Sequence, residues 1–269
     1  IAETAVDAET IVLTDTTLTV GGLNDTISGI EEFILTGGDL SSLIDASAYT
    51  LGNVTILGEG GDDTLIGSSG DDFINGGSGN DTLTGGLGND SMLGGSGGDS
   101  LDGGSANDTL AGNGGDDTLN GGIGLDSIDA GTGNDLVDGG DDNDTVLGGP
   151  GLDTLNGGAG NDRILGESQN DTINGDDGDD TLIGGSGSDV IRGGSGSDTL
   201  QVFGNSLDIA DLVAGGSSGI ERIDFISSRS EFVIIDRDAA NSLTDGNVLR
   251  VEGGAEDIVF LSTSDNWSD

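Results

Sequence analysis

The sequence contains no cysteine, no histidine and no lysine, and each absence excludes a class of chemistry. Without cysteine the chain has neither a disulfide nor a thiolate metal site, and without histidine it lacks the usual general base and a common zinc ligand. All six basic residues are arginines, whereas 51 residues are acidic, so that the formal net charge is −45. Such an acidic chain repels nucleic acid and anionic lipid, and we expect neither as a partner.

Hydrophobic residues are also scarce: they make up 32% of the 269 residues, aromatic residues make up 3%, and glycine occupies 55 positions. No apolar run approaches the roughly 20 residues of a membrane span, so we expect no direct membrane insertion. Low hydrophobicity with high charge predicts disorder unless the sequence is periodic. The chain begins at Ile1 without a signal-peptide pattern and stops just after Trp267, as expected of a mature product or of a segment of a longer protein.

The sequence is periodic, and the repeat is nine residues long. An aspartate occurs at every ninth position from 63 to 198, and an apolar residue follows each aspartate by two positions. Glycine precedes the aspartate by five positions except at Ala130, and by two positions except at Ala106, Asp142 and Gln169. The sixteen aspartates are Asp63, Asp72, Asp81, Asp90, Asp99, Asp108, Asp117, Asp126, Asp135, Asp144, Asp153, Asp162, Asp171, Asp180, Asp189 and Asp198.

This repeat predicts an all-β fold, a parallel β-roll (β-solenoid). Glycine allows a tight turn of about six residues, and a single inward apolar residue suits a strand of about three. Two turns and two strands close a coil of about 18 residues, so the sixteen repeats give about eight coils. Alternate aspartates then stack along two opposite edges, with Asp63 next to Asp81 on one edge and Asp72 next to Asp90 on the other.

Carboxylates stacked at strand spacing predict a bound cation, because they cannot all stay ionised without one. The expected cation is Ca²⁺, which accepts six to eight oxygen ligands in loose geometry, whereas Mg²⁺ requires a near-ideal octahedron. If each ion bridges two neighbouring turns on one edge, the roll holds about 14 interior sites. Residues 58–200 contain 29 acidic residues and two arginines, a formal charge of −27, which about 14 Ca²⁺ ions would neutralise. All sixteen repeat aspartates are therefore predicted metal ligands.

The segment GGSGNDTLT at 76–84 matches the nonapeptide G-G-x-G-x-D-x-U-x, and residues 58–201 thereby resemble the repeats-in-toxin (RTX) family. The resemblance implies a parallel β-roll with Ca²⁺ in its turns, which folds after export through a type I secretion channel into calcium-rich surroundings. The turns containing Ala106, Asp142 and Gln169 depart from the motif. If positive φ is needed there, we expect those turns to bind calcium more weakly.

Both flanks of the repeat contain short β-branched runs, at 11–13, 54–57, 232–235 and 258–261, which predict strands. We therefore expect three parts: an N-terminal β flank or cap at 1–57, the calcium-binding roll at 58–201, and a C-terminal β module at 202–269. Covered ends protect a solenoid from edge pairing. The C-terminal part is similar to β modules of very large bacterial surface adhesins, which implies a location on the bacterial cell surface.

The expected function is structural and not enzymatic: a rigid extracellular spacer or building block of a surface layer, adhesin or filament. The expected partners are calcium ions and other copies or segments of the same surface protein. Two alternatives remain, an adhesin region that binds a ligand directly, or the secretion and folding module of an RTX toxin or hydrolase whose active domain lies elsewhere. An exposed aromatic or basic cluster would favour direct adhesion.

Two further readings of the sequence are disfavoured. The G-x-S-x-G match at 94–98 has no histidine to complete a catalytic triad. Ice binding is disfavoured by the third turn position of the repeat. In similar rolls that bind ice this position is threonine, whereas here, in the copies from 60 to 132, it is threonine only at Thr132.

Overall fold

The computed structural model describes residues 2–4, 10–30, 32–202, 220–225, 232–236, 250–252 and 258–262, with side chains described for 10–30 and 32–201. Its strands form two long sheets, A and B, and one short pair. In sheet order, sheet A contains β1 (Ala2–Thr4), β5 (Glu32–Thr36), β7 (Asn53–Leu57), β9 (Phe73–Ser78), β11 (Ser91–Ser96), β13 (Thr109–Gly114), β15 (Ser127–Thr132), β17 (Thr145–Pro150), β19 (Arg163–Ser168), β21 (Thr181–Ser186), β23 (Asp198–Val202), β24 (Ile220–Phe225) and β26 (Arg250–Glu252).

Sheet B runs alongside sheet A. Its order is β22 (Val190–Ser195), β20 (Thr172–Asp177), β18 (Thr154–Ala159), β16 (Leu136–Asp141), β14 (Thr118–Ile123), β12 (Ser100–Ser105), β10 (Thr82–Leu87), β8 (Thr64–Ile66), β6 (Leu43–Ala48), β2 (Thr10–Thr14), β3 (Thr17–Val20) and β4 (Leu23–Thr26). The short pair is β25 (Phe232–Asp236) with β27 (Ile258–Ser262). The described residues contain no helix long and apolar enough to cross a membrane.

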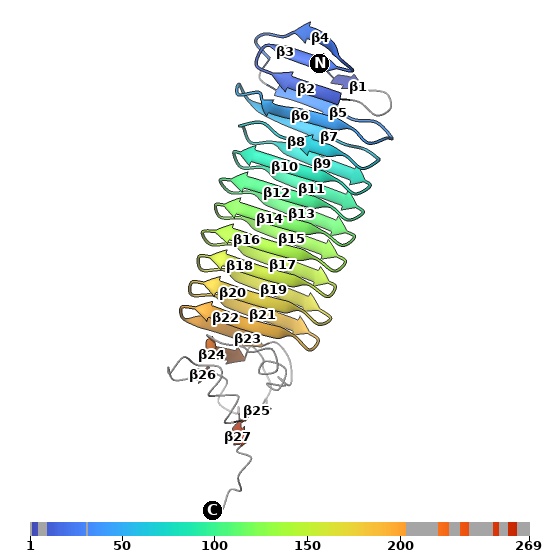
Figure 1. The fold of residues 1–269 in the computed structure, drawn as a ribbon. Coiled ribbons are helices and arrows are strands. Elements are labelled where there is room, and N and C mark those ends of the chain that lie inside the picture. Colours follow the sequence, from blue (N-terminus) through green and yellow to red (C-terminus); the bar gives the residue numbers. More distant parts are fainter. Residues whose placement is uncertain are drawn as a thin grey trace, which may run out of the picture.

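The chain alternates between the two sheets and builds a parallel β-solenoid, as predicted (Figure 1). Each strand of the roll pairs in parallel with the strand 18 residues further on, so that Leu83 lies beside Leu101 and Leu101 beside Leu119. The solenoid has about nine turns, one more than the repeat predicts. The extra length arises because β5, β6 and β7, which precede the repeats, continue the same two sheets.

One apolar side chain per strand fills the narrow core between the sheets. Leu83, Leu101 and Leu119 are each 1% exposed, and the equivalent residues from Leu65 to Leu200 are buried in the same row. The next inward position carries glycine, so each strand supplies only one large side chain to the core. The roll therefore buries little apolar surface for its length, which limits the stability available from hydrophobic burial alone.

The strands of the roll from β9 to β22 are six residues long and not three, which corrects the expected division into turn and strand; only β8, with three residues, has the expected length. β10 runs through both glycines of its repeat to Leu87 and leaves three residues, 88–90, as the turn. The reason is the exact stacking of equal coils: Gly86 and Leu87 pair with Gly104 and Ser105, so the ladder continues into the bend. Even the turn is hydrogen-bonded between coils, as Gly79 N–H donates to the Ser96 carbonyl at 2.8 Å.

The predicted strands of both flanks are confirmed, since the four β-branched runs lie in β2, β7, β25 and β27. We call residues 10–57, apart from residue 31, the N-terminal cap. It ends sheet B with the antiparallel strands β3 and β4. The Tyr49 ring packs edge-on against Phe33 at 5.3 Å, and its hydroxyl donates to the Ile30 carbonyl at 2.8 Å. The boundaries proposed at 57/58 and 201/202 stay predictions.

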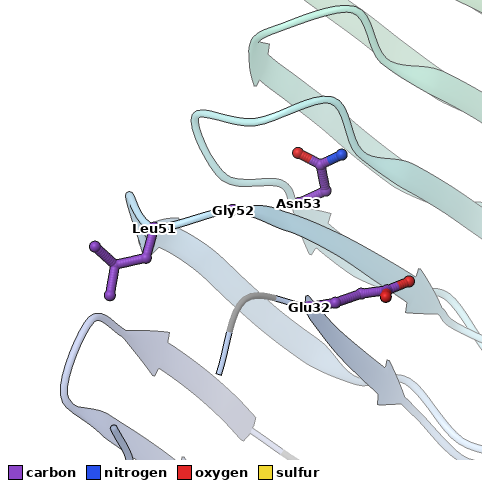
Figure 2. A pocket seen from close by; sticks show the side chains of 4 residues that line it. All are labelled: Glu32, Leu51, Gly52 and Asn53. Carbon is purple, nitrogen blue, oxygen red and sulfur yellow. The ribbon is translucent and has the colours of Figure 1, made fainter. Parts of the chain in front are cut away.

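An open cavity of about 500 Å³ lies beside the cap and is lined by Glu32, Leu51, Gly52 and Asn53. Glu32 and Asn53 lie in register on β5 and β7. Figure 2 shows the Leu51 and Glu32 side chains pointing away from each other. This lining offers one carboxylate and one amide that do not converge, so the candidate site lies instead in the turns of the roll.

Candidate calcium-binding turns

The repeat aspartates form two rows, one on each edge of the roll. Asp63, Asp81 and every second aspartate to Asp189 lie where the chain passes from sheet A to sheet B, and we call this the A-to-B edge. Asp72, Asp90 and every second aspartate to Asp198 lie on the opposite, B-to-A edge. The predicted stacking on two edges is confirmed. All sixteen carboxylates except the partly exposed Asp189 are at most 3% exposed.

One carboxylate oxygen of each aspartate links its coil to the preceding one. Asp63 N–H donates to Asp81 Oδ1 at 2.7 Å, and Asp81 N–H donates to Asp99 Oδ1 at 2.8 Å. The same bond recurs along both edges to Asp180 and Asp198, at 3.0 Å. Because the donors are backbone groups, this ladder of Oδ1 atoms fixes the rotamer of every aspartate in it.

The second oxygen, Oδ2, accepts no hydrogen bond in thirteen of the sixteen aspartates although it is buried. The thirteen are Asp63, Asp81, Asp90, Asp99, Asp108, Asp117, Asp126, Asp135, Asp144, Asp153, Asp162, Asp171 and Asp180. Buried acceptors without a partner are rare and costly in folded proteins. A row of them, repeated turn after turn, indicates that something other than the protein satisfies these atoms.

Glycine keeps the space around the Oδ2 atoms open, except at Asp135, where Ala130 takes its place. A Cβ added to Gly94 would lie 2.5 Å from Asp99 Oδ2 and 2.9 Å from the carbonyl oxygen of Gly112 in the next coil. The same pair, an Oδ2 atom and a carbonyl oxygen, faces the equivalent Gly103 at 2.5 and 2.6 Å. Two acceptors that face one small space need either a proton or a cation between them.

The electrostatics of the turns agree with that requirement. Burial, followed by repulsion from Asp72 and Asp108, raises the pKa of Asp90 to about 8. Burial and repulsion from the neighbouring carboxylates likewise raise the pKa of Asp117 and of Asp144 to about 7. Without a cation, the fold therefore favours the protonated form of Asp90 at neutral pH and disfavours ionisation of the other stacked aspartates.

The donor set fits Ca²⁺. In the described part of the chain no group of three or more Asp, Glu, His or Cys side chains gathers at one point. An ion in a turn would therefore be held by the repeat aspartates together with backbone carbonyls, an all-oxygen set that suits a hard cation of flexible coordination. Bound calcium would neutralise the stacked carboxylates and tie adjacent coils together. The number of ions, expected to be about 14, stays a prediction.

The three non-glycine residues two positions before an aspartate are strained. Ala106, Asp142 and Gln169 have φ of 83°, 76° and 79°, whereas the positive φ of glycines at this position, from Gly88 to Gly196, are between 106° and 152°. A Cβ on Gly97 would collide with the Gly79 carbonyl of the preceding coil. A side chain at this position must therefore displace the backbone, and Ala106, Asp142 and Gln169 do adopt positive φ, although Gly70 and Gly151 at the same position do not.

We expect Gln169→Gly to stabilise the roll and to lower the calcium concentration needed for folding. The turn that ends at Asp171 contains two strained residues, because Glu167 also has a positive φ, of 75°. Relief at one position is worth roughly 1 kcal/mol, partly offset by the greater flexibility of glycine in the unfolded chain. Gln201→Gly, in the extended strand β23, is the matched control and should destabilise. Equal calcium midpoints for the two variants in a folding titration would contradict the expectation.

A second ladder on the outside of the turns was missed by the sequence analysis. The residue just before the repeat aspartate is Asn or Asp in eleven of sixteen copies. Its side chain accepts a backbone hydrogen bond from the next coil: Asn80 N–H donates to Asp62 Oδ1 at 2.8 Å, and Gly98 N–H donates to Asn80 Oδ1 at 2.7 Å. The enrichment of Asn and Asp was the available signal. Leu125 and Leu152 interrupt this ladder, because they offer no acceptor.

Comparison with known families gives one match. The RTX calcium-binding nonapeptide repeat (4 copies) matches residues 50–74, 57–92, 66–101, 93–128, 102–137, 121–155, 138–173, 147–182 and 165–200. These windows together cover residues 50–200, more than half of the chain. No curated protein matches the sequence.

Proposed function

Because this chain belongs to the RTX calcium-binding nonapeptide-repeat family, we propose that it is an extracellular structural segment whose roll folds on binding calcium and then serves as a rigid spacer or building block of a bacterial surface structure. Such repeats are typical of secreted proteins exported by type I channels. The observation that carries the proposal is the series of thirteen buried Oδ2 atoms without a hydrogen-bond partner.

Calcium is proposed to act as the switch between the exported chain and the folded spacer. In a calcium-poor cytoplasm the segment 58–200 keeps its charge of −27 and stays extended enough for export. In calcium-rich surroundings the ions neutralise the turns, and metal affinity becomes part of the folding free energy. Each coil contacts only its neighbours through parallel ladders, so the folded product is a stiff rod.

A spacer is favoured over a directly binding adhesin by the surface of the roll. Its exposed large apolar residues, the feature on which a docking site would be built, are spread over several strands and both edges. They are Phe73, Leu87, Ile123, Leu125, Leu136 and Leu152. Within the described roll, residues 58–201, the only basic residues are Arg163 and Arg192, on different sheets. A catalytic role is not proposed, since the sequence contains neither His nor Cys.

Small-angle X-ray scattering of the whole chain tests the proposal. We expect a rod-like profile in millimolar calcium and an expanded one in excess chelator. For residues 58–200 the radius of gyration is on the order of 40 Å when unfolded and ~15 Å when compact, so the change is large. A profile that is the same in calcium and chelator would contradict a calcium-built spacer.

A further inference from the structure

The first turn of the B-to-A edge is built differently from the others. Asp72 is buried like its equivalents, but Ser68 saturates its carboxylate. Ser68 N–H donates to Asp72 Oδ2 at 2.5 Å, and Ser68 Oγ lies 2.9 Å from Oδ1 and 3.0 Å from Oδ2. Val54 N–H donates to Oδ1 at 2.7 Å. Both oxygens of Asp72 thus accept hydrogen bonds, in contrast to repeat aspartates such as Asp90 and Asp108, whose Oδ2 accepts none.

Ser68 also joins the groups that a bridging ion would join. Its hydroxyl lies 3.2 Å from the carbonyl oxygen of Gly52 in the cap and accepts from Gly70 N–H at 3.1 Å. It therefore contacts both oxygens of one carboxylate and a carbonyl of the preceding coil at the same time. Ser68 itself is 5% exposed, so these contacts are shielded from water.

A single residue that departs from the repeat creates this turn. Elsewhere the residue four positions before the aspartate is mostly glycine with positive φ, such as Gly77 at 103° and Gly86 at 115°. Ser68 is not among the residues with positive φ. A backbone in the ordinary region turns the Ser68 N–H toward Asp72 Oδ2. The space beside Gly67 faces Asp72 Oδ2 and the Gly85 carbonyl as in the other turns, so this turn differs by the donors that Ser68 adds to the carboxylate.

We propose that Ser68 takes the place of calcium at Asp72, so that the first B-to-A turn closes without metal and joins the roll to a cap that folds independently of calcium. This proposal rests on the proposed calcium-dependent folding of the roll. It removes Asp72 from the predicted calcium ligands, and the ions of this edge begin at Asp90.

The cap has what a metal-independent unit needs. Its parallel strands β2, β5, β6 and β7 carry two buried apolar residues each, such as Ile11 with Leu13 on β2 and Val54 with Ile56 on β7, where the strands of the roll carry one large apolar residue. The described cap contains no buried carboxylate. Asp15 accepts from both the backbone and the hydroxyl of Thr50, at 2.6 and 2.9 Å. A folded cap presents preformed strand edges on which the first calcium-dependent coils can stack.

Hydrogen exchange of the whole chain in excess chelator at neutral pH and low salt tests the proposal. We expect slow exchange at Val54 and at other cap amides, fast exchange throughout 82–200, and a large gain of protection in 82–200 when calcium is added. Fast exchange throughout the cap, in a chain whose roll does respond to calcium, would overturn the inference and leave the proposed function intact. A roll protected in chelator would instead overturn the proposed function.

Ser68→Gly separates this role from general stability, because it restores the glycine of the repeat. We expect exchange at Val54 to become about tenfold faster or more in chelator, as hydrogen bonds to a carboxylate are lost, and calcium to restore protection by binding to Asp72. Ser68→Thr, which keeps the hydroxyl, should behave like the unchanged chain. Ser69→Gly, at an exposed neighbour, is the matched control. Equal exchange in the Ser68→Gly and Ser69→Gly variants would overturn the assignment to Ser68.

Discussion

Folding of the Asp117→Ala variant is expected to require much more calcium than folding of Asp198→Ala. An interior aspartate serves the ions on both of its sides, whereas Asp198 ends the B-to-A row of repeats and serves one. If the loss of one carboxylate weakens an ion about tenfold, or ~1.4 kcal/mol, the interior variant loses about twice as much as the terminal one. Calcium titrations followed by circular dichroism measure the two midpoints. Coincident midpoints would argue against ions bridging neighbouring turns.

Asp117→Asn is the control that separates metal binding from the hydrogen-bond ladder. An asparagine keeps an acceptor for Asp99 N–H, which lies 2.7 Å from Asp117 Oδ1, but it carries no charge. We expect this variant to bind calcium more weakly than the unchanged chain. In chelator we expect it to contain more β structure than Asp117→Ala. If Asp117→Asn and Asp117→Ala showed the same strand content in both conditions, the hydrogen-bond ladder would make no measurable contribution to folding.

The calcium-free protein is expected to gain β structure when the pH falls from about 8 to about 5. The folded-state pKa is about 8 for Asp90, about 7 for Asp117 and about 6 for Asp63, because burial penalises the charged form in each case. These values lie above the ordinary 3.8, so the folded state binds more protons than the unfolded state. Its stability is thus greatest at low pH and is lost as the pH rises through about 6 to 8.

Protons and calcium compete for the same oxygens, which gives the opposite dependence when calcium is present. Calcium affinity should fall as the pH falls, because the ion binds the ionised carboxylate. Circular dichroism in chelator and in calcium across this pH range measures both trends. A calcium-free chain whose strand content does not change or decreases between about pH 8 and about pH 5 would contradict the account of the buried Oδ2 atoms.

The repeat could be predicted from the sequence because each coil is a copy of the one before it. The nine-residue spacing places Asp81 next to Asp99 and Leu83 next to Leu101 without any knowledge of long-range contacts. The same argument predicted the two edges and the choice of an oxygen-binding cation. Strand length was wrong, because the sequence distinguishes apolar from glycine positions but does not show that the glycines Gly85 and Gly86 continue the ladder.

The exceptions to the repeat could not be predicted from the sequence. In the sequence, Ser68 is a small residue at a position that is usually glycine. Only the structure shows that it donates hydrogen bonds to the Asp72 carboxylate. The sequence predicts weaker calcium binding in the turn that contains Gln169, and the φ of 79° at Gln169 gives a physical reason for that expectation. The sequence indicates short strands in the cap, but its junction with the roll depends on contacts between residues distant in sequence, such as the bond from Ser42 N–H to Asp63 Oδ1.

The central claim is that residues 58–200 need calcium in order to fold. Their charge of −27 opposes compaction, and one large inward side chain per repeat cannot offset the ~1–2 kcal/mol per residue lost in ordering the backbone. Circular dichroism in excess chelator at neutral pH and low salt, followed by titration to millimolar calcium, tests it most directly. We expect a largely disordered spectrum that converts cooperatively to a strand spectrum as calcium is added. A full strand spectrum that persists in chelator would contradict it.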